Sequence, residues 1–497
     1  MWTDLWEFVE RAESPRITVV GDVMLDSYVW GEVGRISPEG PIPVVHVREK
    51  EYRPGGAASV AAMLAALGAQ VRCVGVIGDD LEGSRLMQEM DEAGVDISGL
   101  VTCTDRPTIV KSRFMGYVQT AGRSLQQIVR VDEEEVKPLA AEAVDKVLEQ
   151  ATAEEDDFVV VEDMSKGLFT PELVGQIIEW SDLQSQPLLV DPERGEDYAR
   201  YTGADYIVPN RAEAEAATGI ELDGVEAYRR AASQLLDTLN LEAAIIKLDR
   251  DGIFFATAEG EDKHVPTTAL EVADVTGAGD MVAASVSFAL AAGRDLSEAV
   301  TLANVAAGIE VSRQGATAVS RKDLQDELQA QADPSSRKIK GREEIKQIVE
   351  DARSRGQTVG FTNGCFDLLH LGHVELIRHA GRQADLLVVA TNTDRSTKEL
   401  KGPDRPINTE DVRTKILAAL SDVDYVVLFD EKSVLPLIKE LRPDVLVKGG
   451  DYGKEGVVGH DFVESYGGRV ELAPRVEGLS TTELVERIAR NHGNDSA

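Results

Sequence analysis

The sequence has 497 residues, of which 43% are hydrophobic, and it carries a formal net charge of −36. A chain of this length exceeds what one hydrophobic core usually supports, so we expect at least two domains of roughly 100–200 residues each. The excess of 88 acidic over 52 basic residues argues against nucleic acid and anionic membranes as partners, and no run of 18 apolar residues occurs. Three cysteines without metal-ligand spacing, together with an acidic N-terminal segment, favour a cytoplasmic protein.

Short β-branched runs alternate with helical segments along the first 320 residues, which predicts an α/β layout with a mostly parallel sheet. The expected strands lie at residues 17–20, 71–76, 158–161, 188–190, 206–208 and 244–248. Two further β-rich segments, 43–48 and 108–117, fall outside this alternation and are expected to form a lid. Strands off the main sheet expose unpaired edges, so this lid is also the expected interface of a homodimer.

The stretch 274–280, Asp-Val-Thr-Gly-Ala-Gly-Asp, joins an extended segment to an apolar helix expected at 281–292. Free backbone N–H groups of Gly277, Ala278 and Gly279 at the start of that helix would bind an anion. Asp280 follows at once and could take a proton from a hydroxyl that attacks a bound phosphate. The pattern indicates a kinase without a P-loop, although Gly-Ala-Gly before a helix is equally compatible with close packing alone.

Carboxylates also follow two of the expected strands, at the end where open α/β sheets bind their ligands. Asp22 and Asp26 follow the first strand and could bind sugar hydroxyls, while Asp22 as the cap of a turn is the alternative. Asn210 and Glu213 begin the helix after strand 206–208 and could order a Mg²⁺–phosphate complex through water. Compensation of the helix dipole is an equally ordinary role for Glu213.

Five motifs in this order resemble the ribokinase-like carbohydrate kinase family: Gly21-Asp22, Gly55-Gly56, the stretch 75–80, Asn210-x-x-Glu213 and Gly277-Ala-Gly-Asp280. The resemblance implies that Asp280 is the catalytic base and that Gly277–Gly279 form the anion hole. It assigns ATP binding to Asn210, Arg211, Ala212, Glu213, Asp249, Gly252 and Asn304, and sugar binding to Asp22, Asp26, Gly55 and Gly56. Arg113 and Lys166 are our candidates for a phosphate on the substrate, with an ordinary surface position as the alternative for each.

Residues 326–344 change character, being polar with Pro334 and without apolar periodicity, and this predicts a linker. The sequence thus divides into a kinase domain at 1–325 and a second domain at 345–497. A strand at 358–362 runs into Asn363-Gly-Cys-Phe-Asp-Leu-Leu-His-Leu-Gly-His373. His370 and His373 flank a helix N-terminus, where phosphates bind well, and no third residue with metal-ligand spacing follows them.

This His-x-Gly-His segment resembles the nucleotidyltransferase family that includes cytidylyltransferases and bacterial heptose adenylyltransferases. The resemblance implies that His370, His373 and Lys398 stabilise charge on the phosphates during transfer. It assigns nucleotide binding to Thr362, Asn363, Gly364, Phe366, Asp367, Lys401, Arg405, Lys448, Gly449, Asp451, Ser480 and Thr481. The segment that starts at Arg475 resembles the cytidylyltransferase version, so the choice between ATP and CTP stays open.

Together the two halves resemble the bifunctional heptose 7-phosphate kinase and heptose 1-phosphate adenylyltransferase family. This implies a three-layer kinase domain with a β lid, then a Rossmann-like domain, with Mg²⁺ as cofactor and ATP as substrate of both. The kinase would phosphorylate O1 of D-glycero-β-D-manno-heptose 7-phosphate and the second domain would make ADP-heptose for lipopolysaccharide core, with a separate phosphatase acting in between. The segment 162–167 departs from the family pattern, which leaves a different sugar phosphate open. Retention of one half as a non-catalytic nucleotide-binding or oligomerising module is the other alternative.

Overall fold

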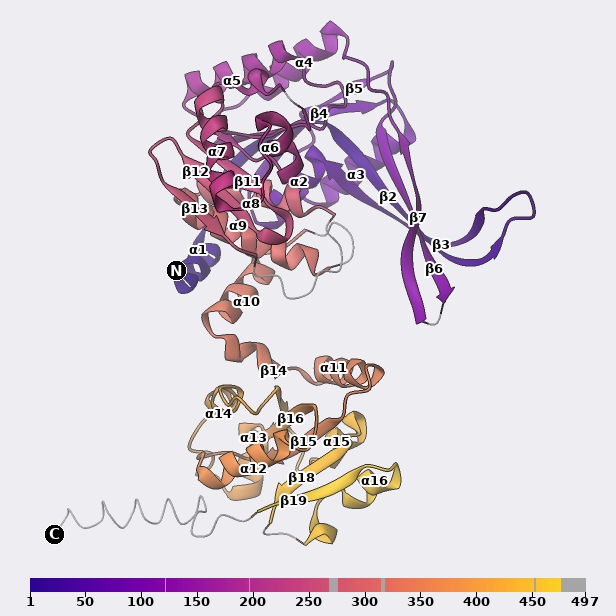
Figure 1. The fold of residues 1–497 in the computed structure, drawn as a ribbon, viewed down its shortest axis with the longest axis vertical. Helices are drawn as coiled ribbons and strands as arrows, with labels where there is room; N and C mark the ends of the chain where they lie inside the picture. Colours follow the sequence, from indigo (N-terminus) through magenta and orange to yellow (C-terminus); the bar gives the residue numbers. More distant parts are fainter. Residues whose placement is uncertain (121, 196, 268–275, 314–317, 451–452, 475–497) are drawn as a thin grey trace, which may run out of the picture. The chain divides into compact units, whose positions relative to one another are not determined.

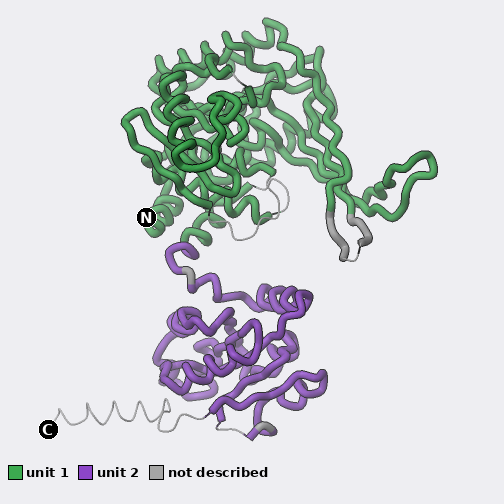
Figure 2. The backbone as a smooth tube through the Cα atoms, in the orientation of Figure 1, with its two compact units in different colours: residues 1–328 green, residues 329–497 purple. Residues whose placement is uncertain are grey.

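The computed structural model describes residues 1–120, 122–195, 197–267, 276–313, 318–450 and 453–474. The chain forms two compact units, residues 1–328 and 329–497 (Figure 2). Each has its own sheet and its own hydrophobic core. Within the described ranges no helix combines the length and apolarity that crossing a membrane requires.

Unit 1 is built on a nine-stranded sheet with the order β13-β12-β11-β10-β9-β8-β1-β4-β5 (Figure 1). All its neighbours pair in parallel except β11–β12 and β12–β13, so the carboxyl ends of most strands meet at one edge. The strands are β1 (Arg16–Gly21), β4 (Gln70–Gly78), β5 (Leu100–Cys103), β8 (Phe158–Glu162), β9 (Leu188–Asp191), β10 (Tyr206–Ile207), β11 (Ala243–Lys247), β12 (Ile253–Thr257) and β13 (Asp262–Val265). The predicted α/β architecture is confirmed.

Helices cover both faces of this sheet and give the unit three layers. One core packs the sheet against α1 (Trp2–Arg11), α2 (Ala57–Ala66), α3 (Leu81–Glu92), α8 (Ala278–Ala291), α9 (Leu296–Val311) and α10 (Arg321–Ala332). The other packs it against α4 (Ala141–Ala151), α5 (Pro171–Gln184), α6 (Arg211–Thr218) and α7 (Val225–Leu239), with the short turn η1 (Ala199–Tyr201). Helices α2, α8 and α9 are rich in alanine, and such small side chains let a helix pack closely on a β-branched sheet.

Four long strands form a second sheet that projects from unit 1 (Figure 1). Its order is β3-β2-β6-β7, from β2 (Val23–Ile36), β3 (Pro43–Gly56), β6 (Ile109–Thr120) and β7 (Gly122–Glu133). The expectation that segments 43–48 and 108–117 are strands outside the main sheet is therefore confirmed. Strands β2 and β7 were not predicted, and the polar, charged sequence of β7 lacks a clear apolar alternation.

Unit 2 contains a six-stranded, fully parallel sheet with the order β14-β17-β16-β15-β18-β19. Its strands are β14 (Ile339–Lys340), β15 (Val359–Gly364), β16 (Leu386–Asn392), β17 (Tyr425–Phe429), β18 (Val445–Gly449) and β19 (Arg469–Ala473). The helices are α11 (Arg342–Ser354), α12 (Leu371–Gly381), α13 (Asp394–Lys401), α14 (Glu410–Ala418), α15 (Leu435–Leu441) and α16 (His460–Ser465), with η4 at Lys454–Gly456. Strand order reverses at β15, which is where doubly wound sheets bind nucleotides.

The predicted linker at 326–344 is mostly regular structure. Helix α10 continues through Ala332, and Leu324 and Leu328, one turn apart, are fully buried in unit 1. The turn η3 (Pro334–Lys338) leads into β14, which pairs with β17, and Lys338 donates to the Leu420 carbonyl at 3.0 Å. Two leucines are enough to anchor this polar helix. The linker prediction used the average composition of the segment, and that average does not show two buried positions.

Candidate active sites

The glycine turn before α8 has the conformation that an anion site needs. Gly277 caps the helix with φ of 93°, a backbone region that L side chains rarely adopt, and Asp280 lies in the first helical turn. The helix behind the turn is buried from Met281 to Ala289, so its N-terminal N–H groups are held in place. Asp274 and Val275, which belong to the predicted motif, lie outside the described residues.

Asp280 opens onto a cavity of about 1420 Å³ at the carboxyl ends of the main sheet. Enclosure by the protein and the negative charge of Asp191 raise the pKa of Asp280 to about 6, although Lys247 and a hydrogen bond with Ser59 oppose this shift. A carboxylate with this pKa is ionised at neutral pH and is a stronger base than a solvated aspartate. The predicted base therefore lies beside the predicted anion turn, in a cavity.

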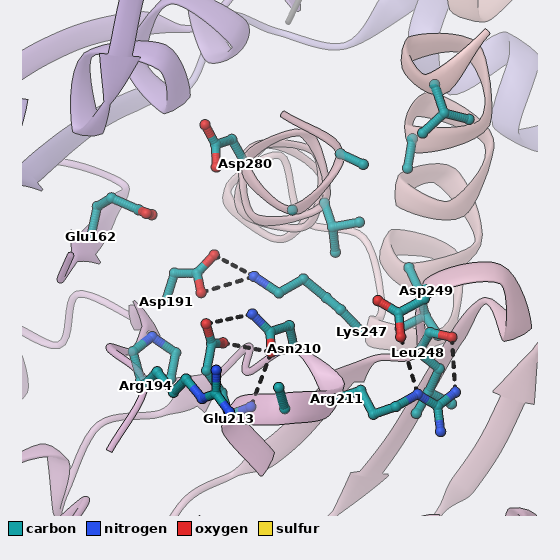
Figure 3. A pocket seen from close by; sticks show the side chains of 18 of the residues that line it. Glu162, Asp191, Arg194, Asn210, Arg211, Glu213, Lys247, Leu248, Asp249 and Asp280 are labelled. Atoms are coloured by element: carbon teal, nitrogen blue, oxygen red, sulfur yellow. Dashed lines mark hydrogen bonds and ion pairs between the residues drawn. The ribbon is translucent and has the colours of Figure 1, made fainter. Parts of the chain in front are cut away.

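Two more acidic side chains and one lysine surround this point (Figure 3). Glu162 ends β8, Asp191 ends β9 and Lys247 ends β11, and the Lys247 ammonium donates to both Asp191 oxygens at 2.6 and 2.8 Å. A Cβ on Gly279 would lie 3.4 Å from the Lys247 Nζ, which places this ammonium next to the anion turn. Burial lowers the pKa of Lys247, but Asp191 and Glu213 outweigh it and the net shift is upward.

Sequence reasoning missed Lys247, Asp191 and Glu162. Each is the last residue of a parallel strand, and that shared position is the signal that could have found them. Burial, Asp191 and Asp280 raise the pKa of Glu162 well above its ordinary value. Its Oε2 has no hydrogen-bond partner among the described residues, so this acid is available to a ligand.

The predicted nucleotide residues line the same cavity, where Figure 3 shows Asn210 and Glu213 near Asp191 and Lys247. Asn210 and Glu213 close a capping box at the start of α6: the Glu213 carboxylate accepts from the Asn210 backbone at 2.7 Å and from its side chain at 2.5 Å. Ala212 lines the cavity between them. The carboxylate of Glu213 is thus committed to the helix cap while facing the cavity.

The remaining candidates for nucleotide binding mainly stabilise the wall of the cavity through contacts within the protein. Arg211 pairs with Asp249 at 3.1 Å and with Asp251 at 2.6 Å. Gly252 has φ of 93°, and a Cβ there would lie 2.1 Å from the Val265 carbonyl, so this turn requires glycine. Asn304 donates to the Pro266 carbonyl at 2.8 Å and holds the chain that follows β13.

Among the predicted sugar-binding residues, Asp22 also binds other parts of the protein. Asp22 is buried, and its Oδ2 accepts backbone hydrogen bonds from Met164 at 3.1 Å and Lys166 at 3.0 Å, which fixes the loop after β8. Burial raises the pKa of Asp22 to about 6 against the effect of these bonds. The carboxylate of Asp22 therefore positions the loop at 163–167. This role is closer to the alternative, in which Asp22 caps a turn, than to the binding of sugar hydroxyls.

Gly55 and Gly56 lie where the lid joins α2, and the position of Gly56 requires glycine. Gly56 has φ of 57°, and a Cβ there would lie 2.4 Å from the Asp22 carbonyl, which accepts from Ala57 at the helix start. A Cβ on Gly55 would meet the Asp26 carboxyl carbon at 3.1 Å. Asp26 itself pairs with Arg113 at 2.7 Å, with both side chains nearly buried.

Unit 2 carries a different kind of site where β15 leads into α12. His370 caps α12 and His373 lies in its first turn, with the two rings stacked 3.8 Å apart and the edge of Phe366 against His373. Burial, followed by the neighbouring His370 and Lys401, lowers the pKa of His373 to about 4, and burial also lowers the pKa of His370. Both shifts favour the neutral form of the ring.

Several buried polar atoms at this site have no hydrogen-bond partner among the described residues. They are Thr362 Oγ1, Asn363 Oδ1, His370 Nδ1, His373 Nδ1 and Thr397 Oγ1. Buried polar atoms are normally paired, so a concentration of unpaired ones indicates a place that a polar ligand completes. Lys448 at the end of β18 donates to the Asn363 carbonyl at 2.7 Å, and burial lowers its pKa to about 8.

Other predicted residues of this site bind the protein itself. Arg405 pairs with buried Asp367, which also accepts from the Ile407 backbone at 2.6 Å. Gly364 lies against the Phe366 ring and Gly449 ends β18, while Lys398 is exposed and Lys401 ends α13. Asp451, Arg475, Ser480 and Thr481 lie outside the described residues.

Sequence reasoning also missed Arg413, which is 1% exposed. Its guanidinium donates to the Cys365 carbonyl and to Thr391 Oγ1, each at 2.8 Å, and pairs with Asp394 at 2.8 Å. It therefore ties the histidine-bearing segment to β16 and α13. No local pattern marks an arginine that folding buries.

Comparison with known proteins matches each unit to a family model. Residues 14–323 match the pfkB family carbohydrate kinase model and residues 361–487 match the cytidylyltransferase-like model. Unit 1 resembles phosphofructokinase-2 from Escherichia coli, with a TM-score of 0.55 and 20% identity over 64% of this chain and 100% of that chain, which shows the fold. Ribokinase from Arabidopsis thaliana gives a TM-score of 0.51 and 20% identity over 64% of this chain and 99% of that one.

The fold and the two sites define a bifunctional transferase, a sugar kinase followed by a nucleotidyltransferase. The protein is 44% identical to the bifunctional protein HldE of Syntrophotalea carbinolica over 98% of both chains. It is also 44% identical to that of Caulobacter vibrioides over 95% of this chain and 96% of the other. The chain belongs to the HldE family.

Proposed function

We propose that unit 1 phosphorylates O1 of D-glycero-β-D-manno-heptose 7-phosphate with ATP, and that unit 2 transfers the adenylyl group of ATP to heptose 1-phosphate. The observation that carries the first half is the position of Asp280, whose pKa is raised to about 6, beside the Gly277 turn and in the cavity. Near-full-length similarity to HldE proteins supports the combination of the two activities.

In the kinase reaction the sugar hydroxyl oxygen bonds to the γ-phosphorus of ATP, the bond from that phosphorus to its bridging oxygen breaks, and ADP leaves, while Asp280 takes the hydroxyl proton. The N–H groups of Gly277, Ala278 and Gly279 and the ammonium of Lys247 stabilise the negative charge of the transferred phosphoryl group. Asp191 holds that ammonium at 2.6 Å and keeps it from turning away. The proton ends on Asp280 and leaves to solvent after the product.

The acidic cavity is suited to Mg²⁺ that enters with the ATP phosphates. Mg²⁺ typically uses one or two protein carboxylates and fills its other positions with water and phosphate oxygens. Glu162 and Glu213 would hold such a complex, while the described residues contain no cluster of three or more ligating side chains. Mg²⁺ would neutralise charge on the phosphates. Glu213, bound in its cap, acts through water in this proposal.

In the second reaction a phosphate oxygen of the sugar attacks the α-phosphorus of ATP and pyrophosphate leaves. The neutral imidazoles of His370 and His373 donate hydrogen bonds to the phosphates at the N-terminus of α12. Lys448, held by Asn363, and Lys398 supply positive charge. ATP as the nucleotide follows from the family, and CTP is the competitor that an assay must include.

Three further features belong to this proposal. The kinase product is a bisphosphate, whereas the second reaction starts from a monophosphate, so a separate phosphatase must act between them. The long lid strands β3 and β7 form the two edges of their sheet and would pair with a second copy of the chain. The site of action is the cytoplasm. A molecular mass by light scattering that stays monomeric at every concentration would contradict the dimer.

The experiment supplies the full chain with heptose 7-phosphate and ATP, and separately with heptose 1-phosphate and either ATP or CTP. The expected products are the 1,7-bisphosphate and ADP-heptose with pyrophosphate. Phosphorylation of other sugar phosphates at equal kcat/KM would overturn the heptose assignment. Preference for CTP would overturn the adenylyl assignment.

A further inference from the structure

Cationic side chains gather where the lid sheet meets the cavity of unit 1. Lys111 and Arg113 lie two positions apart on β6, so their side chains share one face of the lid. Arg130 lies directly opposite Arg113 on β7, and Lys166 follows β8 on the loop that Asp22 holds. Lys111 and Lys166 both line the cavity. These four residues form the lid cation cluster.

Three members of the cluster are already neutralised by a carboxylate of their own. The pairs are Arg113 with Asp26 at 2.7 Å, Arg130 with Asp132 at 2.9 Å, and Lys166 with Glu134 at 2.9 Å. Lys111 has neither an ion-pair partner nor a hydrogen-bond partner within the described ranges of the chain. Lys111 is therefore the one member of the cluster without an ion pair in the described part of the chain, and it lies on the wall of a cavity lined by both acidic and basic side chains.

An unpaired, half-buried ammonium costs stability, because it loses water without gaining a counter-charge. Burial lowers the pKa of Lys111, and Lys166, Arg113 and Arg130 lower it further against the opposing effect of Asp26. A bound phosphate would remove this penalty, since it carries up to two negative charges and accepts from all three donors of an ammonium.

The position of Lys111 indicates which phosphate it meets. Lys111 comes from the lid, whereas the nucleotide candidates come from α6 and from the turn η2 (Asp249–Asp251) with Gly252. The anion turn for the transferred phosphoryl group belongs to α8. A phosphate bound at Lys111 therefore belongs to the substrate that the lid covers and not to ATP.

We infer that Lys111, supported by the lid cation cluster, binds the phosphate that the kinase substrate already carries and makes the enzyme select a phosphorylated sugar. The inference rests on the proposed kinase function and names the residue that sets its substrate preference. Arg113 and Lys166, the candidates from the sequence, then act as paired neighbours that shape the site.

The test compares kcat/KM for heptose 7-phosphate with kcat/KM for the same heptose without the phosphate, using the full chain. Lys111→Met should lower the ratio of these two constants by about 10- to 100-fold, the effect of losing one hydrogen-bonded charge pair. Most of the loss should appear in KM for the phosphorylated sugar. Lys111→Arg should restore most of the ratio, because it keeps the charge. Lys50→Met removes an exposed lysine from lid strand β3 and should leave the ratio unchanged.

A second readout needs no turnover: calorimetric binding of heptose 7-phosphate to Asp280→Asn, with and without Lys111→Met. Weaker binding in the double variant supports the subsite, and equal binding overturns it. An unchanged preference in Lys111→Met also overturns it, and Lys111→Gln provides a second neutral variant if the methionine variant does not fold. Failure of the unaltered chain to phosphorylate heptose 7-phosphate would overturn the proposed kinase function itself, which is a distinguishable result.

Discussion

The two sites of this chain handle phosphate groups with opposite electrostatics. In unit 1 the ends of β8 and β9 and the first turn of α8 bring Glu162, Asp191 and Asp280 together around one lysine. In unit 2 the corresponding strand end carries two neutral histidines and several unpaired polar atoms. Both sites nonetheless include a helix N-terminus, that of α8 in unit 1 and that of α12 in unit 2.

The difference follows from the nucleophile that each reaction uses. A sugar hydroxyl must lose a proton when it attacks, so unit 1 needs a carboxylate whose pKa is raised toward neutrality. A sugar phosphate has a second pKa of about 6 and is already an anion at neutral pH. It therefore has no proton that a base must remove, and a nearby carboxylate would repel it. A general base in one site and none in the other is the central claim of this account.

The largest effect is expected from Asp280→Asn, which keeps the shape of the side chain and removes its basicity. Kinase activity should fall by more than about 10²-fold, the usual contribution of a positioned base, while adenylyl transfer stays intact. Parallel assays of both reactions on one preparation measure this. Kinase turnover close to that of the unaltered chain would refute the role of Asp280.

Nearly as large an effect, on the other activity, is expected from His373→Ala. Loss of one donor that stabilises developing charge typically costs about 10²- to 10³-fold in rate, so adenylyl transfer should fall within that range. Kinase activity should not change. His379→Ala, on the last turn of α12, is the matched control and should leave both activities intact. Equal losses in the two variants would show that α12 is merely destabilised.

Separating the units should have the smallest effect. The chain can be cut between residues 332 and 338. The two units divide at Leu328 and Gln329, α10 ends at Ala332, and β14 starts at Ile339. Fragments 1–332 and 333–497 should each fold and keep their own activity within about threefold, because each has its own core. Activity that returns only on mixing would contradict independent units.

Much of the fold could be predicted because parallel strands buried on both faces leave strong apolar runs, as in β8 and β9. The anion turn and the two histidines could be found because glycine spacing and His-x-Gly-His are local signals. The lid was recognised only in part, since β7 carries charge where a buried strand would be apolar.

The roles of individual site residues were harder to predict, because they depend on partners distant in the sequence. Asp22 resembles a sugar ligand until its bonds to Met164 and Lys166 are seen, and Asp367 resembles a nucleotide ligand until Arg405 occupies it. Lys247 is positioned by Asp191, and Arg413 is positioned by the Cys365 carbonyl together with Thr391 and Asp394. Such contacts across 56 and 48 residues leave no periodic trace.

The most direct test of the central claim is the pH dependence of the kinase kcat in the unaltered chain and in Asp280→Asn. The pKa of Asp280 is raised to about 6, so its basic form is present above this pH and is lost as the pH falls through it. The unaltered chain should therefore lose activity about tenfold per pH unit below pH 6, whereas the residual activity of Asp280→Asn should be flat over the same range. An acid limb that persists in Asp280→Asn would contradict the assignment of Asp280 as the base.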